Sequence, residues 1–287
     1  AGAICALLIL LLSACGIFHA KYIKTTSYDV IINKTIPERT SMKVVLLADT
    51  HFGYNAGVLH ARELVRKINK QKPDLVCIAG DIFDNEYDAI RNPEKLKKTL
   101  RGIKSTYGVY ACWGNHDLNE EILAGFTFKH KDGDLSDIKD PRMKKFLEDS
   151  NIHILEDESV LINDQFYVIG RKDASLTEKI HETRKAPAQL TEKLDRDKPI
   201  IMIDHQPKEL QELADAGVDL DLCGHTHDGQ TFPGNFTIKL MWENPCGLLS
   251  KDNMTNITTS GAGVWGPAMR IGTDSVICSI NIQLKKA

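Results

Sequence analysis

The sequence predicts an α/β fold for this chain of 287 residues. From Lys43 onward, short apolar runs of strand length alternate with amphipathic helical patterns, and this alternation is typical of α/β domains. No Pro-, Ser- or Gln-rich linker interrupts the alternation, and no internal repeat is visible. The length and the ordinary share of hydrophobic residues, 42%, allow one large core or two modest ones.

The strands are predicted from short apolar runs of five or six residues. These runs cover residues 43–48, 74–79, 107–112, 166–170, 199–203 and 218–223. The tail over 273–284 differs, because its apolar and polar residues alternate as in a sheet with one buried face. The stretch 234–270 has several glycines and short β-prone runs, and it shows no long helical pattern.

The helices are predicted from apolar residues that recur with helical spacing. The predicted helices cover residues 56–71, 93–103, 141–150 and 207–217. In the first of them Val58, Ala61, Val65 and Ile68 share one face. The second begins at a proline, and the last begins at a proline and ends at a glycine, which are common helix boundaries.

The N-terminal segment 1–20 is strongly apolar and carries no charge from Ala1 to Phe18. Eighteen residues reach the lower limit for a membrane helix, about 17–25 residues. A signal peptide, a lipoprotein anchor with Cys15 in "LSAC", and a buried core helix are alternatives. We favour a membrane helix and therefore expect a membrane-associated protein. The orientation in the membrane is left open.

Charge and cysteine content exclude several classes. A formal net charge of −3 gives no sign of a nucleic-acid surface. The seven cysteines are scattered, odd in number and include no CxxC pair, so neither a zinc ribbon nor a disulfide framework is expected. Cys77, Cys112 and Cys223 lie in apolar runs and are interpreted as small strand residues.

Polar side chains gather directly after five of the predicted strands. The clusters are Asp49 and His51; Asp81 and Asp84; Asn115, His116 and Asp117; Asp204 and His205; and His225 and His227. In open α/β sheets ligands bind at the carboxyl ends of strands. We therefore expect these five clusters to converge in space.

Each cluster alone is a weak signal, because an Asp after a strand is often a helix cap. For Asp84, Asp117 and Asp204 a structural role stays open, either in local turn or cap bonds or in supporting the ligand residues. Together the clusters predict a metal site. Carboxylates and imidazoles without thiolates fit Mn, Fe or Zn. Because the candidate ligands exceed four, we expect two divalent ions that share one carboxylate, and Asp81 is the natural bridge.

The motifs resemble those of the calcineurin-like metallophosphoesterases. They are DxH (49–51), GDxxD (80–84), GNHD (114–117), His205 and GHTH (224–227). The resemblance covers about residues 42–284, and "IDHQP" and "GHTHDGQTFPG" look most like a membrane-associated bacterial phosphodiesterase branch. One departure is Ala48, where that branch often has serine before the aspartate. The resemblance implies a four-layer sandwich of two mixed β-sheets flanked by helices.

The resemblance also implies roles for individual residues. Asp49, His51, Asp81 and His227 would hold one metal, and Asp81, Asn115, His205 and His225 would hold the second. In an extended segment His225 and His227 share a face, so each could reach one ion while Thr226 points away. His116 would contact the phosphate or protonate the leaving group, with Asp117 fixing its orientation. Arg171 is either a phosphate contact or, as we favour, an exposed solvated residue.

The predicted function is hydrolysis of a phosphodiester or pyrophosphate bond by a metal-bridging hydroxide. A membrane anchor beside the domain favours a lipid-linked or envelope substrate, with the loops 85–92, 118–140 and 171–198 setting specificity. A scaffold with the same fold and a dead site is the alternative, although every ligand position is filled. An amide hydrolase of the barrel type fits less well, because its HxH motif would follow the first strand.

Overall fold

The computed structural model describes residues 2–120, 122–123, 126–127 and 139–285. Much of the predicted loop 118–140 lies outside these residues. The helices are α1 (Gly2–Ala20), α2 (Val58–Gln71), α3 (Pro93–Leu100), α4 (Pro141–Asp149), α5 (Ala174–Lys179), α6 (Pro187–Thr191), α7 (Leu210–Asp215) and α8 (Gly234–Met241), with 3-10 turns η1 (Tyr87–Ala89) and η3 (His227–Gly229).

The strands form two mixed sheets of six strands each. The first sheet has the order β1 (Ile23–Ile32), β14 (Ser275–Leu284), β2 (Ser41–Leu47), β3 (Leu75–Ala79), β4 (Val109–Cys112), β7 (His153–Ile154). The second has the order β12 (Gly247–Lys251), β13 (Met254–Thr258), β11 (Leu220–Cys223), β10 (Ile200–Ile203), β9 (Phe166–Gly170), β8 (Glu158–Ile162). A separate hairpin joins β5 (Ile122–Leu123) to β6 (Phe126–Thr127).

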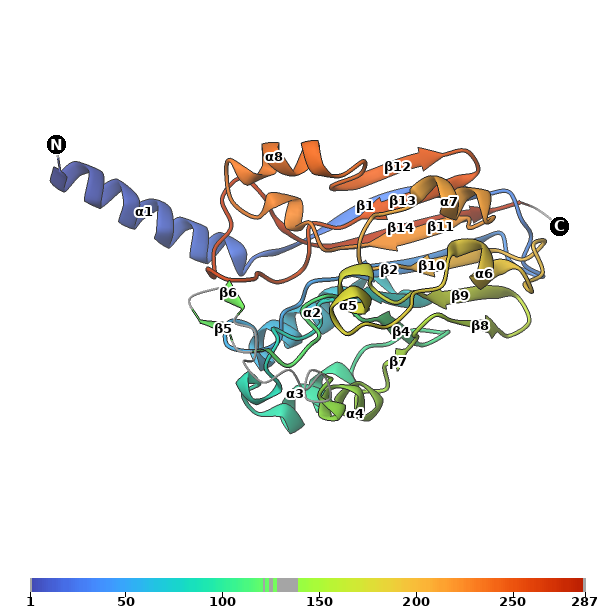
Figure 1. The fold of residues 1–287 in the computed structure, drawn as a ribbon, viewed down its shortest axis with the longest axis horizontal. Coiled ribbons are helices and arrows are strands. Elements are labelled where there is room, and N and C mark those ends of the chain that lie inside the picture. The colour runs from blue at the N-terminus through green and yellow to red at the C-terminus, as the bar shows by residue number, and fades with distance from the viewer. Residues whose placement is uncertain (1, 121, 124–125, 128–138, 286–287) are drawn as a thin grey trace.

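The sheets pack face to face, with helices on both outer faces (Figure 1). Successive residues of one strand pack in different layers, because their side chains point to opposite faces of the sheet. Val44 and Leu46 of β2 lie between the sheets, whereas Val45 and Leu47 pack under α2, α3 and α4. In the second sheet, residues of β9 and β10 pack outward against α6 and α7. The predicted four-layer sandwich is confirmed.

The apolar N-terminal segment forms α1, as predicted. This helix is long and apolar enough to cross a membrane, and 11% of it is buried in the rest of the chain. Figure 1 shows α1 projecting from one end of the molecule. Its last turn packs against the loop before β14, where Arg270 N donates to Gly16 O at 3.1 Å.

Strand β1 was not predicted from the sequence. It pairs in parallel with β14 over ten residues, from Ile23 with Ser275 to Ile32 with Leu284. The first sheet therefore begins at Ile23, upstream of residue 42. Residues 23–32 give no clear strand signal in the sequence, because β1 is an edge strand with several exposed polar residues, such as Lys24 and Asp29. Short α5, α6, β7 and β8 also carry too few residues for a periodic signal.

Helix α8 lies in the stretch where the sequence shows no long helical pattern. Its eight residues, GNFTIKLM, contain a single charge and none of them is buried. A helix of only eight residues is too short for a clear periodic signal. The remaining predicted helices begin at or near the predicted positions, with the ends of α3 and α7 shorter than expected.

The tight packing between the sheets predicts that a cavity in β14 lowers the free energy of unfolding. Ile280 is fully buried there, so Ile280→Ala should lower the free energy of unfolding by about 2–5 kcal/mol. Ile31 of β1 is 69% exposed, and Ile31→Ala should change it by no more than about 0.5 kcal/mol. Urea unfolding of the full chain in detergent measures both. Equal effects of the two substitutions would contradict this packing.

Candidate metal centre

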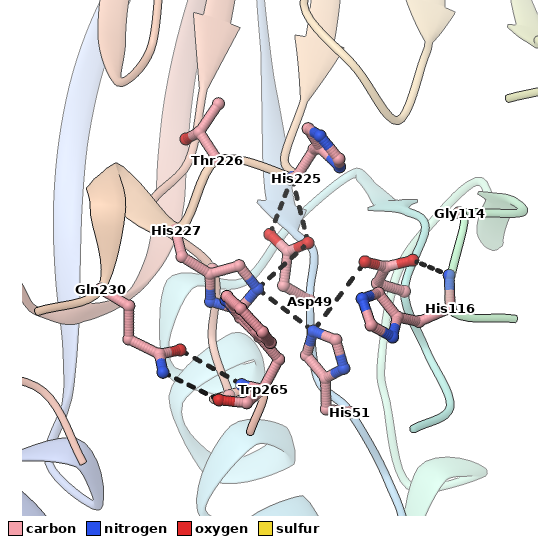
Figure 2. A network of polar contacts seen from close by, with 12 residues as sticks. Asp49, His51, Gly114, His116, His225, Thr226, His227, Gln230 and Trp265 are labelled. Carbon is pink, nitrogen blue, oxygen red and sulfur yellow. Dashed lines mark hydrogen bonds and ion pairs between the residues drawn. The ribbon is translucent and has the colours of Figure 1, made fainter. Parts of the chain in front are cut away.

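All seven predicted ligands lie together at one edge of the sandwich, at the carboxyl ends of β2, β3, β4, β10 and β11. Among the described residues, three groups of three side chains place one candidate ligand atom each within 4.8 Å of one another. One of them, His51, Asp84 and His116, shares His51 with another, and the remaining two consist of predicted ligands alone. The first of these two is Asp49, His51 and His227, and the second is Asp81, His205 and His225. Figure 2 shows the first group together, with the backbone N–H of His225 donating to the carboxylate of Asp49 while the His225 imidazole points away from it.

In the first group, two imidazole nitrogens face each other. His51 Nε2 lies 3.1 Å from His227 Nε2, and Asp49 Oδ1 lies 3.7 Å from the same His227 atom. All three side chains are buried. Nitrogen lone pairs that meet beside a carboxylate form a donor set suited to a divalent cation.

The second group has the same character. His205 Nε2 lies 3.2 Å from His225 Nδ1 and 3.1 Å from the amide oxygen of Asn115. The carboxylate of Asp81 stands 3.2 Å from His205 Nε2. The amide of Asn115 thus brings a further oxygen ligand to this group.

Asp81 lies between the two groups. Its Oδ2 atom is 3.2 Å from His205 Nε2 and 3.9 Å from His51 Nε2. A single carboxylate oxygen therefore faces ligand nitrogens of both groups. This is the position that a bridging ligand between two ions requires.

The backbone of the ligand residues is strained. Asp49, His51, Asp81, His225 and His227 all have positive φ, between 44° and 71°. Residues with a Cβ rarely adopt this left-handed conformation, which costs about 1–3 kcal/mol each. The expected extended conformation of the HxH segment is therefore wrong. The two imidazoles diverge because left-handed residues flank Thr226, whose hydroxyl is turned away and donates to Pro245 O.

Glycines allow the ligand loops to pack this closely. A Cβ built on Gly114 would lie 2.2 Å from Asp81 Oδ1, and one on Gly224 would lie 2.4 Å from the Cβ of Ala48. Both distances are impossible for real side chains, so each loop needs glycine where it passes its neighbour. The glycine in each of the sequence motifs GNHD and GHTH thus has a steric reason.

Burial sets the charge of the imidazoles. It lowers the pKa of His225 to about 3, helped by the neighbouring His205. Burial, with His51 and Arg270 nearby, also lowers the pKa of His227 well below its ordinary value. Both imidazoles are therefore neutral at pH 7, the form that binds metals. Burial opposes charge on His205 as well, but Asp81 raises the pKa of His205 well above its ordinary value.

The pKa values of the Asp49 and Asp81 carboxylates shift in opposite directions. Burial raises the pKa of Asp49 to about 6, with Asp81 adding to this effect. Burial would also favour protonated Asp81, but His205 and His116 hold the pKa of Asp81 well below its usual range. Two buried carboxylates lie beside the neutral imidazoles of His225 and His227, which offer lone pairs and no positive charge. The donor set therefore fits divalent metal ions.

Several contacts orient the ligand imidazoles. Asp84 Oδ1 lies 3.3 Å from His51 Nδ1, and Ala79 O accepts from His205 Nδ1 at 2.8 Å. Each contact leaves Nε2 directed into the site, as in other metal centres with supporting carboxylates and carbonyls. The open question about Asp84 is thereby answered: it supports His51. Arg270, which no sequence signal marked, is buried and reaches the backbone oxygens of His227 and Ser260.

His116 stands beside the two groups, but the expected partner is wrong. Its Nδ1 lies 2.6 Å from Asn85 Oδ1, so Asn85 orients the ring. The carboxylate of Asp117 instead accepts from the backbone N–H groups of Gly114 and Phe83, at 2.7 and 2.8 Å. Asp117 therefore fixes the loop rather than the imidazole. Asn85 follows Asp84 directly, and this adjacency was the available signal.

Arg171 is not the exposed residue that the sequence suggested. It is buried, and its guanidinium pairs with Asp204 at 3.2 Å and with Glu209. Arg184 also pairs with Asp204, at 2.6 Å. These contacts balance the buried carboxylate beside His205, so Arg171 and Asp204 support the second sheet and do not face the ligand groups.

A cavity of about 350 Å³ opens in front of the metal-ligand groups. One wall is polar and contains Asp81, His116, His225 and His227. The other wall is mainly apolar and comes from α8 and two tryptophans, with Ile238, Met241, Trp242 and Trp265 among its residues. The side-chain amide of Gln230 donates to the backbone oxygen of Trp265 and accepts from its backbone N–H, as Figure 2 shows.

Comparison with known proteins identifies related sequences. The family model for calcineurin-like phosphoesterases matches residues 42–229. An uncharacterized metallophosphoesterase of Campylobacter jejuni is 32% identical over 257 residues, covering 86% of this chain and 61% of its own length. A transmembrane protein with a metallophosphoesterase domain from Danio rerio is 30% identical over 277 residues, covering 92% of this chain and 58% of its own length.

A more distant relative has a named activity. The UDP-2,3-diacylglucosamine pyrophosphatase of Chlamydia trachomatis is 23% identical over 255 residues, covering 75% of this chain and 75% of its own length. The chain spans about three fifths of the length of the first curated relatives it matches.

The close packing of the ligand loops predicts the effect of one methyl group. Gly114→Ala should displace Asp81 and lower affinity for Mn²⁺ by at least about tenfold, since even indirect disturbance of metal ligands costs about 10–100-fold. Gly57→Ala is the control, because a Cβ there meets no atom within 4 Å. Calorimetric titration with Mn²⁺ measures both. Unchanged affinity in Gly114→Ala would show that the loops are not this crowded.

Proposed function

The chain belongs to the calcineurin-like phosphoesterase family, and from this premise we propose that it is a metal-dependent hydrolase of phosphate esters. One observation carries the proposal: Asp81 places one oxygen between two groups of buried imidazole and carboxylate ligands. A pair of divalent ions about 3.5–4 Å apart is the usual catalyst of phosphoester displacement. Every predicted ligand position is filled, which favours an enzyme over a scaffold.

We assign the ligands as the resemblance implies. Asp49, His51, Asp81 and His227 would hold one ion. Asp81, Asn115, His205 and His225 would hold the other. Oxygen and imidazole donors without thiolate suit Mn, Fe or Zn, and the choice among them is part of the proposal. When bound, the ions supply a hydroxide nucleophile at neutral pH and neutralise charge on the phosphoryl oxygens.

The chain's own residues complete the reaction. An oxygen from water joins phosphorus while the bond from phosphorus to the leaving oxygen breaks. His116 borders the cavity, and its Nδ1 is held by Asn85. Its second ring nitrogen is left for the substrate, where it donates a proton to the leaving oxygen or a hydrogen bond to the phosphate. Asp117 holds the loop that carries His116.

We further propose a phosphodiester or pyrophosphate substrate attached to a lipid. Three observations support this choice. Helix α1 is long and apolar enough to cross a membrane. The cavity has a mainly apolar wall opposite its metal-ligand wall. The Chlamydia trachomatis relative is named for the pyrophosphate bond of a diacylated sugar nucleotide.

The bridging position predicts the result of replacing Asp81. Asp81→Asn should reduce Mn-dependent hydrolysis of a soluble aryl phosphodiester by at least about 100-fold, because outer partners of metal ligands alone contribute about 10–100-fold. The matched control is Asp164→Asn, an exposed carboxylate paired with Lys198. An aryl phosphomonoester assayed in parallel gives the ester class. Full activity in Asp81→Asn would refute the dinuclear site.

The position of His116 predicts a separation of binding from turnover. His116→Ala should retain two metal ions per chain and lose about 10²–10⁴-fold in turnover, the usual contribution of a general acid. The exposed His153→Ala serves as the control. Metal content and initial rates measure the two quantities. Loss of metal from His116→Ala, or turnover at the parent rate, would assign the residue another role.

A further inference from the structure

Helix α8 carries an apolar surface that faces away from the molecule. Phe236 and Leu240 lie in the helix, and Phe232 lies two residues before it. The three residues are four apart in sequence and are 63% (Phe232), 60% (Phe236) and 88% (Leu240) exposed. The rings of Phe232 and Phe236 touch edge to face, with centroids 5.9 Å apart. We call these three residues the outer face of α8. No residue of α8 is buried among the described residues, and contiguous apolar exposure of this kind marks an interaction site.

The opposite side of the same helix belongs to the catalytic cavity. Thr237, Ile238 and Met241 line that cavity together with Trp242. Helix α8 is therefore the wall between the metal-ligand groups and the outer face. A helix with its side chains is about 10–12 Å thick, so a surface in contact with the outer face lies about one helix diameter from the cavity.

The outer face is fixed to the base of the candidate membrane helix. Arg270 N donates to Gly16 O of α1, and a Cβ on Gly16 would lie 3.2 Å from Ile271. The N–H of Phe232 donates to the carbonyl of that same Ile271 at 2.8 Å. One short segment thus holds the end of α1 and the start of the outer face. Figure 1 shows α8 and the base of α1 at the same end of the molecule.

Further side chains near this segment suit a membrane surface. Tyr22 lies two residues after the end of α1 and is exposed, and tyrosine is enriched at membrane–water interfaces. Lys239 stands beside Leu240 on the exposed part of α8, as in interfacial helices whose basic residues meet lipid headgroups. Apolar and basic groups therefore occur together where α1 would leave the bilayer.

We propose that the outer face of α8 inserts into the bilayer that α1 spans and delivers lipid-linked substrate from it to the metal centre. Phe232, Phe236 and Leu240 then lie among acyl chains. The substrate's phosphoester moves past α8 into the cavity, while its acyl chains stay in the membrane. This inference rests on the membrane association and lipid-linked substrate of the proposed function. A second copy of the chain on the outer face is the competing occupant.

Lipid contact is tested by fluorescence quenching. The full chain is reconstituted in phosphatidylcholine vesicles with and without brominated acyl chains, as the parent, as Leu240→Trp and as Ile31→Trp. Ile31 has comparable exposure but lies near the far end of β1 from α1. After subtraction of the parent signal, bromine should quench most of the fluorescence at position 240 and little at position 31. Equal quenching at the two positions would overturn the proposal.

Substrate delivery is tested with two aryl phosphodiesters, one soluble and one carrying a diacylglycerol group in the vesicles. Phe236→Ser combined with Leu240→Ser should lower turnover of the diacyl probe at least about tenfold, since each side chain leaves an apolar surrounding. Turnover of the soluble probe should not change, because neither residue lines the cavity. Ile31→Ser is the control. Equal loss with both probes, or no loss with either, would contradict delivery through α8.

The two tests separate failure of this inference from failure of the proposed function. If the parent hydrolyses neither probe, the proposed hydrolase is wrong, while the quenching result still decides whether α8 contacts lipid. If the parent hydrolyses both probes and position 240 is not quenched, the hydrolase stands and the contact with lipid is refuted. Concentration-dependent dimers in detergent with an unquenched position 240 would assign the outer face to a second copy.

Discussion

The site depends on the burial of two carboxylates, Asp49 and Asp81, in one small space. Like charges at close range without water are unfavourable, and the neutral imidazoles of His225 and His227 offer lone pairs rather than positive charge. Divalent cations satisfy both demands at once. The surrounding structure serves this arrangement: the ends of five strands meet there, glycines remove side chains where loops cross, and left-handed residues turn ligands inward. Rigid strands on both sides hold the strain in place.

The parts predictable from sequence are those set by local pattern. Continuous apolar runs mark strands with both faces covered, and the polar clusters follow those runs, so the meeting of all seven predicted ligands could be foreseen. What the pattern could not reveal depends on contacts between distant segments. The orienting partner of His116 proved to be Asn85, and Arg171 proved to be buried against Asp204. Edge strand β1 and helix α8 gave no periodic signal, because β1 alternates weakly and α8 has only eight residues.

The proposals for catalysis and for lipid delivery meet in a single element. Helix α8 is apolar on both sides, which in a water-soluble setting would be a liability, yet here one side lines the cavity and the other is exposed beside α1. A membrane on the outer side gives every apolar residue of α8 an apolar neighbour. Access to the metal centre would then be controlled by the lipid phase rather than by the concentration of substrate in water.

The pairing of β1 with β14 also constrains how the protein is made. β14 lies between β1 and β2 in the first sheet, although it is the last strand of the described chain. During synthesis, at about 5–20 residues per second, β1 emerges long before β14 and then has no partner in that sheet. Strand β1 joins the sheet only when β14 has been synthesised. A chain interrupted before Ser275 would therefore leave β1 unpaired, and an unpaired strand is a template for association with other chains.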